Sequence, residues 1–85
     1  MNLMATLMSE ISAACSVDQN ELSLETKIDE IGLDSFSLVR ILTTIESQCG
    51  IELSEQEVAL LLEATLIADY LNIFNRALAR HPSHA

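Results

Sequence analysis

One serine of this chain stands where its hydroxyl could carry a phosphate ester. Gly32, Leu33 and Asp34 form the end of a loop, and from Phe36 onward the apolar residues follow helical spacing. Asp34 or Ser35 can therefore act as the N-cap, whose side-chain oxygen accepts a free backbone N–H. The first turn of a helix offers unpaired N–H groups and the positive end of the helix dipole. A phosphate on the Ser35 oxygen would thus be stabilised by the helix that starts there.

No residue of the chain is placed to make Ser35 a nucleophile of its own. The two histidines, His81 and His84, lie near the C-terminal end, and no Gly-x-Ser-x-Gly motif presents a hydrolase serine. A serine hydrolase is therefore excluded for want of a base. Two interpretations of Ser35 remain: an ordinary capping serine, which residue chemistry alone favours, or a substrate that another enzyme modifies.

The spacing of apolar residues predicts helices, and no stretch alternates apolar and polar residues as a strand does. Gly50 suits the left-handed C-terminal stop of the second helix. Ser54 with Glu57 three residues later forms a capping box at the start of the third. The expected fold class is all-α, a four-helix bundle with a short third helix. The helices should cover roughly residues 2–15, 35–49, 55–61 and, from Leu66 or Ile67, on to residue 78.

The apolar faces of the first two helices can be assigned from the same spacing. In the first helix the stripe consists of Leu3, Leu7 and Ile11, widened by Met4, Met8 and Ala14. In the second helix we expect one inward face made by Phe36, Val39, Leu42 and Ile45, with Leu38 and Ile41 beside them. Phe36 could be either a core aromatic or a half-exposed neighbour of Ser35.

Residues 16–34 form a connection that is long for a helical bundle, in which most such loops have about 2–8 residues. By itself this length would count against the helix assignment. The loop does carry regularly spread apolar side chains that could pin it onto the core. They are Val17, Leu22, Leu24, Ile28, Ile31 and Leu33.

The run Gly32-Leu33-Asp34-Ser35-Phe36 resembles the Gly-x-Asp-Ser-Leu signature of acyl carrier proteins and the related peptidyl carrier domains. Two further segments fit the family pattern: the acidic start of its third helix at 54–57, and Asp-Tyr in its fourth helix at Asp69-Tyr70. The resemblance extends from about Leu3 to Leu78. It implies an acyl-carrier-protein-like bundle whose long first loop crosses the helices, with a carrier domain at 1–80 and a flexible tail at 81–85.

The resemblance also implies a cofactor and a set of partners. Ser35 would carry a 4'-phosphopantetheine arm, installed from coenzyme A by a phosphopantetheinyl transferase with a divalent metal. Asp34 would help that transferase engage. The terminal thiol of the arm would hold acyl or aminoacyl groups as thioesters, so the further partners would be loading and acyl-processing enzymes. The protein itself would not be an enzyme.

Partner contacts are expected around the serine, at Leu33, Phe36, Ser37, Val39, Arg40 and Glu57. Arg40 is the main departure from the family pattern, because carriers of bacterial fatty-acid synthesis usually show glutamates along the exposed face of the second helix. Here that face carries Ser37, Arg40, Thr44 and Ser47, with Glu46 its only acid. We therefore expect an acyl carrier of specialised polyketide, lipid or related biosynthesis. The alternatives are an aminoacyl or peptidyl carrier, or a small acidic adaptor without the arm.

The charge of the chain limits its other partners. Residues 1–69 hold all 13 acids and only Lys27 and Arg40, a net charge of -11, while residues 70–85 hold Arg76 and Arg80 and no acid. The resulting net charge of -9 disfavours nucleic acid and anionic membranes and attracts basic protein surfaces. No apolar run is long enough to span a bilayer. We expect a cytoplasmic, reduced monomer, mature as written.

Two remaining groups of residues have less specific interpretations. Cys15 and Cys49, even with the histidines, match no zinc-ligand spacing, so we expect free thiols and no metal. The segment from Leu60 to Leu62, with Leu66 and Ile67, is apolar on more than one helical face. It could be a core helix throughout, or part of it could border a cavity for an acyl chain or a partner surface.

Overall fold

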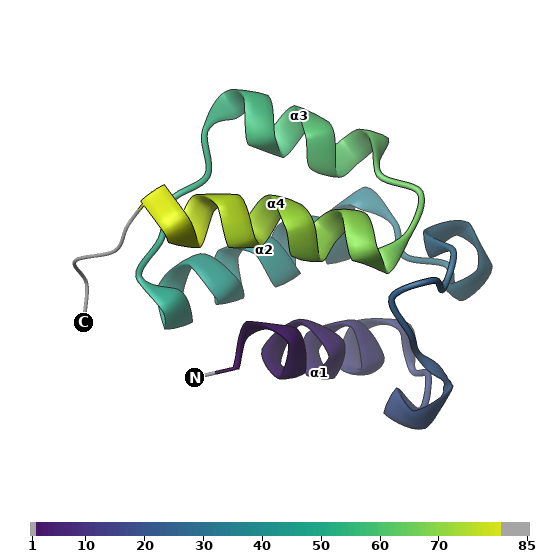
Figure 1. Ribbon diagram of the computed structural model, residues 1–85. Coiled ribbons are helices and arrows are strands. Elements are labelled where there is room, and N and C mark those ends of the chain that lie inside the picture. The colour runs from purple at the N-terminus through teal and green to yellow at the C-terminus, as the bar shows by residue number, and fades with distance from the viewer. Residues whose placement is uncertain (1, 81–85) are drawn as a thin grey trace.

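The computed structural model describes residues 2–80, and the predicted tail at 81–85 lies outside that range. The predicted all-α fold is confirmed, including the short third helix (Figure 1). Helix α4 contacts both α1 and α3, which lie on opposite sides of it, and α1 also packs on α2. The helices are α1 (Leu3–Cys15), α2 (Ser35–Cys49), α3 (Glu55–Glu63) and α4 (Ile67–Arg80).

The core is mainly aliphatic, as a chain with few aromatic residues requires. Its two aromatic members, Tyr70 and Phe74, are one turn apart on α4 and buried. Helix α4 therefore supplies the aromatic centre of the core, and α1 and α3 pack on it. The largest fully buried side chains are Phe74, Leu7, Ile11, Ile41, Ile45, Leu61 and Ile67.

The predicted inward face of α2 is wrong in part. Phe36 is 83% exposed and Val39 is 53% exposed, and the buried residues of α2 are instead Leu38, Ile41, Leu42 and Ile45. The reason is geometric. A strict three-residue repeat falls back by about 60° at each step on a helix of 3.6 residues per turn. Phe36 and Ile45 consequently lie on opposite sides of α2.

Side-chain and glycine caps set most helix ends where the sequence predicts them. Asn2 caps α1 by accepting a hydrogen bond from the backbone N–H of Ala5 (3.2 Å). Gly50 ends α2 in the left-handed conformation at φ 65°. The predicted capping box is present, because Ser54 Oγ accepts from the Glu57 N–H (3.2 Å) and Glu57 Oε1 accepts from the Ser54 N–H (2.8 Å). Helix α3 runs two residues beyond its predicted end, to Glu63.

The long connection between α1 and α2 is an ordered segment with two short 3-10 helices, η1 (Gln19–Glu21) and η2 (Ile28–Ile31). Ile28 is buried, and four other apolar residues of the connection pack against the core at half burial. The backbone is also tied to the α3–α4 junction, where the Ile28 N–H donates to the Thr65 carbonyl (2.9 Å) and the Ile67 N–H donates to the Thr26 carbonyl (3.1 Å). These two bonds fix the connection shortly before it reaches Ser35.

Candidate functional site

The junction before α2 separates the capping role from the serine. Asp34 is the N-cap, and its Oδ1 accepts a hydrogen bond from the Ser37 N–H at 2.8 Å. Ser35 is the first residue of α2 and is exposed. Of the two predicted candidates for the cap, the structure therefore assigns Asp34. The Ser35 hydroxyl is left at the positive end of the helix with no capping bond to make.

Gly32 turns the chain into this junction. It ends η2 in the left-handed conformation at φ 70°, and a Cβ built on it would meet no atom within 4 Å. A side chain at position 32 would therefore be strained by the backbone angle rather than by crowding. The glycine lets the loop reverse direction just before Asp34 and Ser35.

The Asp34 carboxylate is held in its ionised form. The Ser37 backbone N–H is the main cause that lowers the pKa of Asp34, with a further contribution from the Ser37 side chain. The exposed serine thus has a negative charge beside it at neutral pH. Asp29 and Glu30 in η2 are exposed as well and add two more acids at this end of α2.

A small cavity of about 140 Å³ opens beside the serine. Its lining includes Ser35 at the mouth, Leu38 of α2, Leu61 and Leu62 of α3, and Tyr70 of α4. Burial is the main cause that raises the pKa of Tyr70 to about 12, so its phenol stays neutral. The volume lies below the roughly 300–1,000 Å³ of typical small-molecule sites. In this conformation the cavity has room only for a short group, and its lining is mixed because Asp29 and Asp34 also contribute to it.

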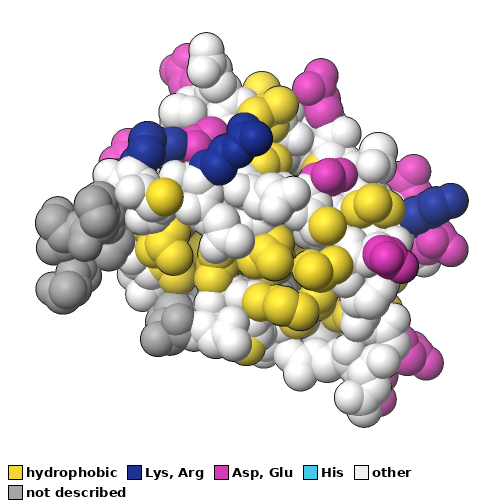
Figure 2. Space-filling view, viewed as in Figure 1, with side chains coloured by type: hydrophobic (Ala, Val, Ile, Leu, Met, Phe, Trp, Pro, Cys, Tyr) yellow, Lys and Arg dark blue, Asp and Glu magenta, His cyan; other side chains and the backbone are white. Residues whose placement is uncertain are grey.

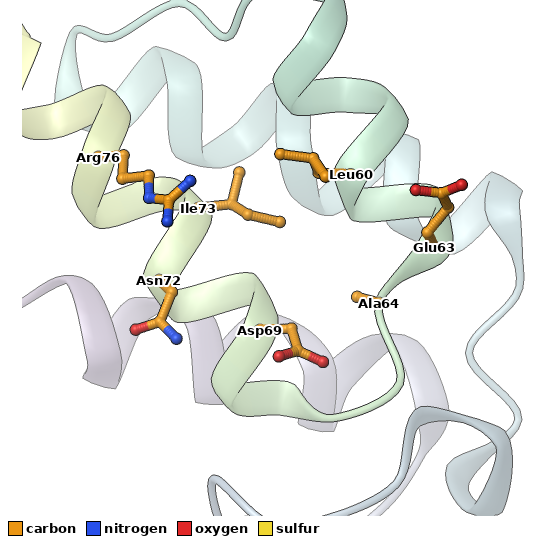
Figure 3. Close-up of a pocket in the computed structure, with 7 residues that line it drawn as sticks. All are labelled: Leu60, Glu63, Ala64, Asp69, Asn72, Ile73 and Arg76. Carbon is orange, nitrogen blue, oxygen red and sulfur yellow. The ribbon is translucent and has the colours of Figure 1, made fainter.

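The three consecutive leucines of α3 lie in three different environments. Leu61 is 1% exposed and belongs to the core. Leu62 is 60% exposed and lines the cavity beside Ser35. Leu60 is 43% exposed and points toward Ile73 across a groove of about 290 Å³ between α3 and α4 (Figure 3). The apolar surplus of this segment is therefore shared between the core, the cavity and the groove.

The α3–α4 groove lies on the side of the molecule that faces the viewer in Figure 1. Figure 2 shows that hydrophobic side chains gather in a band across this face, with acidic side chains around its edge. The rim of the groove includes Asp69 and Arg76 of α4. Asp69 is already engaged, because its Oδ2 accepts from the N–H groups of Thr65 (3.1 Å) and Leu66 (3.0 Å) at the start of α4. These bonds lower the pKa of Asp69.

Five of the six expected partner residues lie within five positions of Ser35 along the chain. Phe36, Val39 and Arg40 are exposed, and Leu33 and Ser37 are half-buried. Glu57 is different. It is buried, its carboxylate forms an ion pair with Arg80, and the same carboxylate accepts from the Ser54 N–H.

The prediction of Glu57 as a partner residue is therefore corrected: Glu57 is a structural group that joins α3 to α4. The Arg80 guanidinium is the main cause that lowers the pKa of Glu57 to about 2. Arg80 also donates to the Glu52 carbonyl at 3.1 Å. The capping-box spacing identified the local role of Glu57, but nothing in the sequence linked it to a residue 23 positions away.

Glu46, the only acid of α2, is engaged in a similar way. Its Oε2 accepts a hydrogen bond from the Leu53 N–H at 2.9 Å, and the residue is half-buried. Glu46 therefore holds the connection between α2 and α3 rather than standing free on the exposed face of α2. The sequence carried no signal for this bond, because the two residues are seven positions apart across a turn.

Cys15 and Cys49 are half-buried and form no disulfide. Burial is the main cause that raises the pKa of Cys15, and the charge of Asp34 adds to it. No cluster of three or more potential metal ligands occurs within residues 2–80. In the same range, no helix combines the length and the apolar content needed to cross a membrane.

A comparison with protein families identifies the kind of protein to which the Asp34-Ser35 junction belongs. The sequence model of the family described as phosphopantetheine attachment site matches residues 5–72. The chain belongs to this family. Its members are carrier proteins rather than catalysts, and their prosthetic group is 4'-phosphopantetheine. The matched residues run from α1 into α4 and include the Asp34-Ser35 junction.

The phosphopantetheine carrier fold explains the long first loop, which the helix pattern alone could not justify. The bundle with its short third helix is consistent with an acyl-carrier-protein-like fold. The family includes both acyl and peptidyl carriers and does not by itself distinguish between them. No individual curated protein matches the chain.

Proposed function

We propose that Ser35 is the residue that bears the 4'-phosphopantetheine arm. The observation that carries this proposal is the division of roles at the start of α2: Asp34 makes the capping bond to Ser37, and Ser35 keeps an exposed hydroxyl at the positive end of the helix. The Gly-x-Asp-Ser pattern places both residues where the family motif has them. The terminal thiol of the arm, when present, holds an acyl group as a thioester.

The residues around Ser35 fit such a group. A phosphate on the serine oxygen would lie at the N-terminus of α2, where anions are stabilised. The cavity beside the serine combines the apolar side chains of Leu38, Leu61 and Leu62 with the carboxylates of Asp29 and Asp34, which suits a short segment of the arm that has both apolar and hydrogen-bonding groups. Asp34 remains ionised next to the attachment point, and we propose that it helps the phosphopantetheinyl transferase and its divalent metal to engage.

We further propose that the cargo is an acyl intermediate of a specialised polyketide, lipid or related biosynthesis. Enzymes of bacterial fatty-acid synthesis favour carriers with glutamates along the second helix. Here α2 has a single acid, Glu46, whose carboxylate accepts the Leu53 N–H. The exposed surface near the serine instead offers Phe36, Val39 and Arg40, and we propose these, with Leu33 and Ser37, as the partner contacts. An aminoacyl or peptidyl carrier is the alternative that uses the same arm.

Mass spectrometry of the intact protein tests the attachment site. After incubation with a broad-specificity transferase, coenzyme A and Mg²⁺, the wild type should gain the mass of one phosphopantetheine. Ser35→Ala should gain nothing, and Ser47→Ala, which changes an exposed serine in the last turn of the same helix, should be modified as the wild type is. Because Asp34 is the cap, Ser35→Ala should also keep the stability of the wild type. A mass gain on Ser35→Ala would contradict the proposal.

The cargo can be identified on the protein isolated from its own cells. The mass that exceeds the arm-bearing form gives the elemental composition of the group on the thiol. We expect an acyl group without an amino nitrogen. An aminoacyl or peptidyl group would instead establish the alternative carrier function while leaving the role of Ser35 unchanged.

A further inference from the structure

The buried tyrosine of α4 has a hydroxyl group without a hydrogen-bond partner. Tyr70 is 2% exposed, and within residues 2–80 its hydroxyl neither donates nor accepts a hydrogen bond. Buried tyrosines usually do find a partner, because a phenol that gives up its water without a replacement destabilises the fold. The Tyr70 hydroxyl is therefore available to a group that the protein itself does not supply.

This hydroxyl opens into the cavity beside Ser35. Among the described residues, every fully enclosed side-chain nitrogen or oxygen has a hydrogen-bond partner. The Tyr70 hydroxyl has none, so it must reach an opening, and Tyr70 lines the cavity of about 140 Å³ whose mouth includes Ser35. Burial, followed by the charges of Cys15 and Asp29, raises the pKa of Tyr70 to about 12. At neutral pH the phenol is therefore protonated and can donate a hydrogen bond into the cavity.

The lining of the cavity indicates what kind of group would fill it. Leu38, Leu61 and Leu62 provide apolar contacts, Tyr70 provides a donor, and the Asp29 carboxylate provides an acceptor. A plain hydrocarbon chain would leave the Tyr70 hydroxyl unpaired, which is unfavourable once water is displaced. A compact group that carries both methyl groups and oxygen atoms would satisfy all of these contacts.

The phosphopantetheine arm has such a group directly after its phosphate. It consists of a carbon atom with two methyl groups, a carbon atom with a hydroxyl, and an amide. We call this part the branched segment of the arm. Because it follows the phosphate, attachment to Ser35 brings it to the mouth of the cavity.

We propose that the branched segment docks in this cavity, with its methyl groups against Leu61 and Leu62 and its hydroxyl or amide carbonyl oxygen accepting a hydrogen bond from Tyr70. This inference rests on the proposed function and makes Tyr70 a positioning residue for the arm. Docking ties the root of the arm to the protein. The part beyond the amide then carries the thiol outward, since the cavity has room only for a short segment.

Nuclear magnetic resonance of the arm-bearing protein tests the docking. The two methyl groups of the arm are labelled with carbon-13 through coenzyme A made from labelled pantothenate. In the wild type they should show nuclear Overhauser contacts to the methyl groups of Leu61 and Leu62, and their resonances should be displaced from those of free phosphopantetheine. Tyr70→Phe keeps the ring and removes the donor. It should lower the equilibrium constant for docking about fivefold, the value of one hydrogen bond, so that the resonances move toward the free positions.

The fold of Tyr70→Phe is checked without the arm. Because the hydroxyl makes no hydrogen bond within residues 2–80, the variant should then be at least as stable as the wild type in urea unfolding. Leu62→Ala and Leu60→Ala are the matched pair, since both shorten an exposed leucine of α3 and, of the two, Leu62 lines the cavity whereas Leu60 lines the α3–α4 groove. Leu62→Ala should weaken docking, and Leu60→Ala should leave it unchanged.

The inference is overturned if the wild type shows no contacts between the arm and α3, if Tyr70→Phe docks the arm as well as the wild type does, or if the two leucine variants behave alike. Attachment of the arm is confirmed by mass beforehand. A protein that gains no arm would remove the proposed function itself, whereas an arm-bearing protein without these contacts would remove this inference alone.

Discussion

Two adjacent side chains at the start of α2 perform tasks that a single residue could not combine. A capping oxygen must turn back to the backbone N–H groups, whereas a modified oxygen must point into solvent. Asp34 does the first through its bond to Ser37, and Ser35 is left for the second. The capping bond also lowers the pKa of Asp34, so the serine is next to a carboxylate at neutral pH.

Substitution of Asp34 should separate its two roles. Asp34→Ala removes the capping oxygen and should lower the free energy of unfolding by about 1 kcal/mol. Asp34→Asn keeps an oxygen that can accept from the Ser37 N–H and should retain most of that stability. Both variants should nevertheless be modified more slowly by the transferase, because both lack the charge. Urea unfolding and the initial rate of mass gain give the two readouts. Full modification rates for Asp34→Asn would show that only the cap matters.

At the scale of the element, α3 depends on its contacts at one end. Nine residues are too few for a stable isolated helix, so tertiary contacts must supply its stability. The capping box with Ser54 and the ion pair with Arg80 both use the buried carboxylate of Glu57. Because Arg80 also bonds the Glu52 carbonyl, the last turn of α4 clamps the whole start of α3.

The clamp predicts a specific acid sensitivity. The pKa of Glu57 falls from 4.5 to about 2 in the folded protein, so its stabilising effect is present above about pH 4.5 and is lost as the pH falls toward 2. Since Arg80 is partly exposed, we expect this effect to amount to about 1–2 kcal/mol. Glu57→Gln should be less stable by this amount at pH 7 and should approach the wild type near pH 2.

The matched control is Glu55→Gln, an exposed acid in the same first turn of α3. It should leave the stability at pH 7 nearly unchanged and should follow the wild-type pH profile. Urea unfolding at a series of pH values measures all three proteins. A constant difference between Glu57→Gln and the wild type from pH 7 to pH 2 would argue against a titrating clamp.

At the scale of the whole molecule, the many carboxylates repel one another. Residues 1–69 carry a net charge of -11, while residues 2–80 contain a single ion pair, Arg80 with Glu57. Most acids therefore lie on the surface without a nearby cation. Such a charge favours solubility but opposes the compact state.

Screening should consequently stabilise the protein. Raising sodium chloride from about 10 mM to about 150 mM shortens the Debye length from about 30 Å to about 8 Å. We expect a gain of about 1 kcal/mol, which corresponds to a rise of about 4–8 °C in Tm for a domain of this size. Chloride is preferred to sulfate because sulfate also stabilises proteins by exclusion from their surface. A Tm that falls over this range would contradict the prediction.

The sequence by itself determined the features that depend on neighbours along the chain. The capping box of α3, the glycine stop of α2 and the Asp34-Ser35 junction all involve residues within a few positions of one another. Backbone geometry is nearly fixed over such distances, so spacing predicts the contact. The family resemblance rested on these same local patterns, and it accounted for the long first loop before the structure did.

Only the tertiary structure decided which side chains stay exposed and which are engaged in hydrogen bonds or ion pairs. The bond from Leu53 to Glu46 and the pairing of Glu57 with Arg80 join segments whose separation is set by packing, and no local pattern encodes it. The exposure of Phe36 was decided in the same way. Helical spacing is satisfied both by the side of α2 with Phe36 and by the side with Leu38. The structure buries the side with Leu38, which packs against α1 and the rest of the core, and leaves Phe36 exposed.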